Sequence, residues 1–73
     1  MKNYKKMSIA KFATEVKTDE RLKVDISNTM VAHGGSFVRA LGVCLQHADP
    51  INTYLIAETF VHYLLRYLPS EWD

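Results

Sequence analysis

The sequence contains one cysteine, no signal-peptide pattern and no long apolar run, and each absence excludes a class of protein. The single cysteine, Cys44, has no partner for an intrachain disulfide, which excludes the disulfide scaffolds of small secreted domains. The first residues are basic but lack the continuous apolar core of a signal peptide. No apolar run approaches the roughly 18 residues that a membrane-spanning helix needs. We therefore expect a soluble, cytoplasmic protein.

The chain is short but apolar enough to fold. Its 73 residues are 48% hydrophobic, which excludes intrinsic disorder and indicates one domain, residues 1–73. A core of this size rarely supplies more than about 3–5 kcal/mol without a disulfide, a metal or a partner subunit. Residues 1–25 hold seven Lys or Arg against four Asp or Glu, whereas residues 26–73 hold two against four. The N-terminal part of the chain is therefore the more polar and more basic one. We expect residues 1–7 to be flexible.

Hydrophobic periodicity predicts two helices in the first half. Ser8 is a candidate N-cap, and the apolar residues after it recur with helical spacing, which predicts a helix over 8–17. Thr18 or Asp19 can cap a second helix over 19–33. Leu22, Val24 and Ile26 also alternate as in a strand, but no other segment offers a pairing partner.

The middle of the chain reads HGGS, from His33 to Ser36. We interpret the two glycines as a hinge in which the left-handed conformation ends the preceding helix, with Ser36 capping the next. We expect the following helix, 37–48, to face the core with an apolar stripe that includes the buried thiol of Cys44. Gly42 is expected to permit close approach of another helix. The stripe is Phe37, Leu41, Cys44, Leu45 and Ala48.

Asp49 and Pro50 predict the start of a long helix, because aspartate is a good N-cap and proline suits the first helical position. This helix should run over 50–68 and end at Pro69. Trp72 should fold back on the helices, because an indole is seldom left fully exposed. The expected fold is all-α, a small bundle of three to four helices.

The long helix carries more apolar surface than a monomer of this size needs. A single polar row, Glu58, His62 and Arg66, interrupts it. One apolar face consists of Tyr54, Ala57, Val61, Leu64 and Leu68, and beside it lie Leu55, Phe60, Tyr63 and Tyr67. We predict that the tyrosine-rich side packs against a second copy or another protein. The alternative is that the bundle covers the helix completely.

Two patterns in the sequence contain residue types found in catalytic or metal sites. HGGS is similar to the oxyanion loop of some esterases, but the chain has no G-x-S-x-G nucleophile motif and too few residues for the sheet that motif needs. Cys44 and His47 could form one edge of a metal site, but four ligands are the norm for structural zinc. We therefore expect no catalytic residues, no metal and no cofactor, and hence no enzyme.

A small DNA-binding regulator is the alternative function. In this interpretation the HGGS hinge is the turn of a helix-turn-helix. The following helix offers only Arg39, Gln46 and His47 for contact with bases or phosphates. The lysines lie near the N-terminus instead, which is typical of a solvated face: Lys2, Lys5, Lys6, Lys11 and Lys17.

The segments HGGSFVRAL, residues 33–41, and ADPIN, residues 48–52, followed by an aromatic C-terminal segment, resemble a group of short, uncharacterised helical proteins of bacteriophages and prophages. The resemblance covers a little over half of the chain, and residues 1–30 do not contribute to it. It implies a small helical protein in the cytoplasm of a bacterial host. It implies no catalytic residue.

Together these patterns lead us to expect a non-enzymatic, phage-derived protein that acts as a homodimer. We expect it to bind and inhibit or modulate a host protein or defence complex, for example with an anti-CRISPR action. A phage protein is another possible partner. Nucleic acid is a less favoured partner, and a membrane is not expected. The residues expected at the contact are Tyr54, Tyr63, Arg66, Tyr67 and Trp72.

Overall fold

The computed structural model describes residues 2–72, and within them the fold is all-α as predicted. It has five α-helices rather than three to four, between two short 3₁₀ turns at Tyr4–Lys6 and Ser70–Trp72. The helices are α1 Ile9–Thr18, α2 Glu20–His33, α3 Ser36–His47, α4 Pro50–Thr59 and α5 Val61–Arg66.

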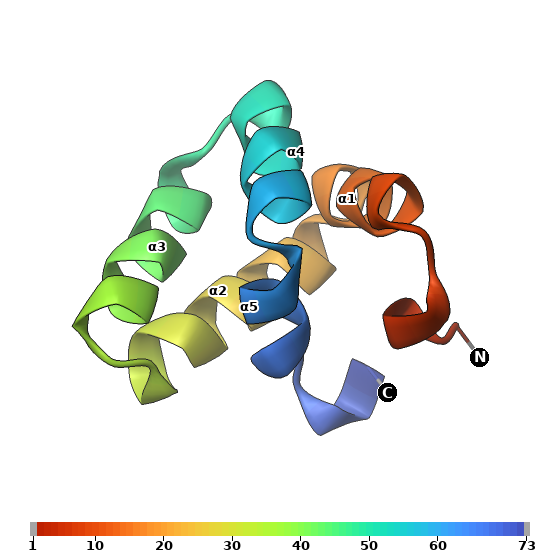
Figure 1. Cartoon of the computed structure of the whole chain (residues 1–73). Coiled ribbons are helices and arrows are strands. Elements are labelled where there is room, and N and C mark those ends of the chain that lie inside the picture. Colours follow the sequence, from red (N-terminus) through yellow and green to blue (C-terminus); the bar gives the residue numbers. More distant parts are fainter. Residues whose placement is uncertain (1, 73) are drawn as a thin grey trace.

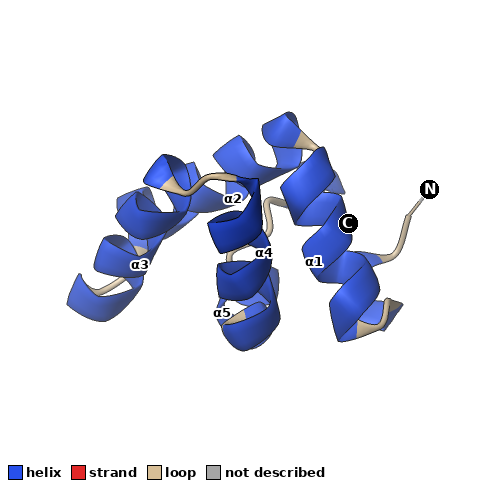
Figure 2. Ribbon diagram, turned by 90° about the horizontal axis from the view of Figure 1, so that it is seen from above, coloured by secondary structure: helices blue, strands red, loops and turns tan. Residues whose placement is uncertain are grey.

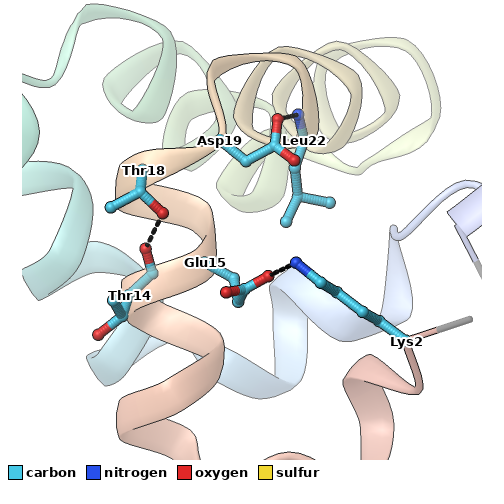
Figure 3. Close-up of polar contacts among 6 residues, drawn as sticks. All are labelled: Lys2, Thr14, Glu15, Thr18, Asp19 and Leu22. Carbon is cyan, nitrogen blue, oxygen red and sulfur yellow. Dashed lines mark hydrogen bonds and ion pairs between the residues drawn. The ribbon is translucent and has the colours of Figure 1, made fainter.

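Local capping fixes three of the helix starts, as predicted. The Ser8 hydroxyl accepts from the backbone N–H of the third residue of α1 at 3.1 Å. Asp19 caps α2 by accepting from the Leu22 N–H at 3.2 Å, as Figure 3 shows. Asp49 caps α4 by accepting from the Asn52 N–H at 2.8 Å, with Pro50 in the first position. Each cap satisfies a backbone donor that the helix itself leaves open.

The helices pack as two pairs. α1 lies beside α4, and α2 lies beside α3, with α5 continuing downward from α4 in Figure 1. The view from above in Figure 2 shows α3 at the far side of α4 from α1. The buried core draws on every helix, and its largest fully buried side chains are Phe12, Leu22, Ile26, Met30, Leu45 and Leu64.

Gly34 and Gly42 serve close packing rather than unusual backbone conformation. No glycine in residues 2–72 has positive φ, so the expected left-handed helix end is wrong. Gly34 is extended, and a Cβ there would meet Val38 Cγ1 at 2.5 Å and the Met30 carbonyl oxygen at 2.6 Å. Gly35, not Ser36, is the N-cap of α3. At Gly42 a Cβ would lie 2.9 Å from Met30 Cβ, which confirms the close approach predicted there.

The predicted long helix is interrupted. Phe60 has φ −112° and ψ 33°, away from helical values, and it separates α4 from α5. The Tyr63 N–H bonds to the Phe60 carbonyl three residues back, at 3.0 Å. Regular helix ends at Arg66 rather than at 68. No proline or glycine lies between Ile51 and Leu68, so the sequence contains no helix breaker that would have predicted this kink.

The two ends of the chain meet beside α2. Trp72 folds back, as predicted, and its indole N–H donates to the Asp25 carboxylate at 2.8 Å. Its ring lies edge-on to Tyr4, with centroids 6.2 Å apart. Within residues 1–7, which we expected to be flexible, Tyr4 is buried in the core, and Lys2 donates to Glu15 of α1 (Figure 3). Burial raises the pKa of the Tyr4 hydroxyl above its ordinary value.

Candidate functional site

The apolar stripe of α3 is rotated relative to the prediction. Its buried residues are Val38, Leu41, Gly42 and Leu45, whereas Phe37 and Cys44 are exposed. The expected burial of Phe37 and of the thiol is therefore wrong. The reason is that α3 packs mainly on α2, so a narrow stripe along α3 is enough to cover that contact. Phe37 is left 56% exposed at the beginning of α3.

Three aromatic rings meet where α3 begins and α4 ends. The Phe37 centroid lies 5.5 Å from that of Tyr63 and 6.1 Å from that of Phe60. Phe60 and Tyr63 are 6.3 Å apart. These spacings are those of favourable tilted and edge-on pairs. We call Phe37, Phe60 and Tyr63 the aromatic cluster.

The cluster borders an exposed face of α4 and α5. Ile51, Leu55 and Tyr63 are spaced in multiples of four residues, and they are 72%, 49% and 38% exposed. A second row with the same spacing is fully polar, and all of its members are exposed: Glu58, His62 and Arg66. Glu58 lies on α4, whereas His62 and Arg66 lie on α5 beyond the break at Phe60. A monomer thus leaves a partly apolar, partly charged face open to solvent.

The surface is hollowed at α5. A depression of about 250 Å³ is lined by His62, Tyr63 and Arg66. Arg66 forms no ion pair with any residue in the range 2–72. The guanidinium therefore presents its N–H donors to solvent beside an aromatic ring. We use the name contact surface for the aromatic cluster together with His62 and Arg66.

The five residues expected at a contact fall into two groups. Tyr63 and Arg66 are exposed and lie on the contact surface. Tyr54, Tyr67 and Trp72 are half-buried and pack against the core. Sequence reasoning placed Phe60 on the tyrosine-rich side but missed Phe37, because helical periodicity assigned that ring to the core. The one available signal was its place beside the glycine hinge, where a helix has just begun.

The HGGS segment and the candidate metal ligands from the sequence have structural positions in the fold. HGGS joins α2 to α3 as a hinge, and His33 is exposed. Residues 2–72 bring together no group of three or more side chains able to hold a metal ion. Within the same range, no helix combines the length and the apolar character that crossing a membrane would take.

The helices on either side of the hinge form a hairpin along their whole length. Near the turn Val38 approaches Gly34, at mid-length Gly42 approaches Met30, and beyond it Gln46 donates to Asn28 at 2.9 Å. At the far end the buried Lys23 ammonium donates to the Ala48 carbonyl at 2.7 Å. A helix-turn-helix instead crosses its helices at about 90–120°. Continuous contact of this kind is typical of an antiparallel αα-hairpin.

Comparison with known proteins gives no relative: no family model, no curated protein and no solved structure matches the chain.

Proposed function

We propose that this chain is a small, non-enzymatic binding protein of phage origin that uses the contact surface to bind a host or phage protein and modulate it. The observation that carries the proposal is the exposure of two rings of the aromatic cluster, Phe37 and Tyr63. Phe37 is 56% exposed, Tyr63 lies beside it, and Arg66 has no ion pair within residues 2–72. Aromatic residues and arginine are the types enriched at interface centres.

Two further features support a protein partner over nucleic acid. The contact surface combines apolar area with a single arginine and a histidine, whereas nucleic-acid surfaces rely on many cations along a track. The α2–α3 hairpin differs from the helix-turn-helix arrangement that the regulator hypothesis needs. The exposed side chains of Ile51 and Leu55 on α4 offer further apolar area to a second copy of the chain.

Affinity capture from a lysate of the bacterial host tests this proposal. The wild-type chain is compared with Tyr63→Ala and with Arg39→Gln, a matched surface variant whose residue is exposed on α3. We expect a protein that survives nuclease treatment and is retained by wild type and Arg39→Gln but not by Tyr63→Ala. Retention by all three chains, or loss of the captured material on nuclease treatment, would contradict the proposal.

A further inference from the structure

The contact surface has two chemically different halves, which restricts what can bind to it. The aromatic half leaves Phe37 56% exposed, which corresponds to roughly 100 Å² of ring surface. Covering such a ring requires an apolar side chain of similar size. The other half is the depression lined by His62, Tyr63 and Arg66.

The lining of the depression favours a carboxylate. A guanidinium has five N–H donors and no acceptor, and its planar fork matches the two oxygens of a carboxylate. Both the Tyr63 hydroxyl and the His62 ring can also donate. Because Arg66 has no acidic partner in residues 2–72, it can accept one from outside without giving up an existing ion pair.

The neighbouring charges define the direction in which an acidic segment can lie. Glu58 is the acidic residue of the same polar row, and it lies on α4, whereas Arg66 lies on α5 beyond the break at Phe60. Glu58 forms no ion pair with Arg66, and its negative charge disfavours a second carboxylate on the α4 side. An incoming acid is therefore favoured only at the Arg66 end.

We propose that the occupant of the contact surface is an acidic segment of a partner protein, in which a carboxylate pairs with Arg66 while an adjacent large apolar side chain packs against the aromatic cluster. This inference rests on the proposed function and specifies the chemistry of the partner. It assigns an anchoring role to Arg66 and to Phe37 together.

Two matched peptides test it: acetyl-Glu-Leu-Phe-Glu-amide and its isosteric partner acetyl-Gln-Leu-Phe-Gln-amide. Each is titrated into ¹⁵N-labelled protein and followed by NMR. We expect the acidic peptide to bind about fivefold more tightly, which is the scale of one exposed charge-assisted pair. The shifted signals should belong to His62, Tyr63 and Arg66.

Single-residue variants test the charged half and the aromatic half of the contact surface separately. Arg66→Gln should reduce the preference for the acidic peptide to about one, whereas Arg39→Gln, with the same loss of charge on α3, should keep it. Phe37→Ala should weaken both peptides equally, because it removes apolar contact only. Circular dichroism checks that each variant keeps its helices, which is expected because all three side chains are exposed.

Equal binding of the two peptides to the wild-type chain, or shifts that map away from the contact surface, would overturn the inference. So would an unchanged preference in Arg66→Gln. If Tyr63→Ala still loses the captured protein while the peptides show no acid preference, the acidic-segment inference fails and the proposed function stands. If capture is also unaffected, both fail.

Discussion

Two neighbouring glycines provide a sharp test of how tightly α2 and α3 are packed. A Cβ added at Gly34 would lie 2.5 Å from Val38 Cγ1 and 2.6 Å from the Met30 carbonyl oxygen. That carbonyl accepts the Gly34 N–H at 2.9 Å and closes α2, so it cannot move without loosening the end of the helix. At Gly35 a Cβ would meet nothing within 4 Å. The same substitution should therefore have very different effects at the two positions.

Overpacking of this severity costs about 1–3 kcal/mol. For a domain of this size, about 2 kcal/mol lowers the unfolding midpoint by roughly 8–16 °C. Gly35→Ala should stay within about 0.5 kcal/mol of the wild type, because the lower entropy of its unfolded chain offsets a poorer N-cap. Thermal and urea unfolding followed by circular dichroism at 222 nm measures both variants. Equal stability of Gly34→Ala and Gly35→Ala would refute the steric reasoning.

Three further predictions concern caps, the chain ends and pH. Asp49→Ala should lower the free energy of unfolding by about 1 kcal/mol in urea titration, because the Asn52 N–H loses its acceptor. Trp72→Phe should cost about 1 kcal/mol by the same assay, because the bond from the indole to Asp25 is lost. Burial raises the pKa of the Tyr4 hydroxyl above its ordinary value of 10.0. The neutral hydroxyl therefore contributes its full stabilisation below pH 10, and this stabilisation is lost as pH rises through the folded-state pKa. In alkaline titration the free energy of unfolding of Tyr4→Phe should fall less steeply with pH than that of the wild type.

The local features of the fold could be predicted because they depend on residues close in the sequence. Ser8, Asp19 and Asp49 each cap the helix expected to follow them, and the glycine hinge separates two helices as interpreted. The folding back of Trp72 also followed from side-chain size alone. Such signals lie within four or five residues of the feature that they specify.

The features that the sequence did not predict depend on how the helices pack against one another. Phe37 and Cys44 fit a helical stripe, but α3 turns a different stripe toward α2, so both are exposed. The break at Phe60 occurs without a proline or glycine, where the ring packs beside Phe37 from another helix. Tyr63 and Arg66 are exposed, and the apolar excess of the long helix was the sequence feature that led us to expect a contact there.

We propose that the exposed part of the aromatic cluster binds another protein. Photo-crosslinking in the bacterial host tests it most directly, with benzoylphenylalanine placed at position 37 and, as a control, at position 9 of α1, where Ile9 is similarly exposed. We expect a discrete protein adduct from position 37 that position 9 does not give. No adduct from position 37, or the same adduct from both positions, would contradict it.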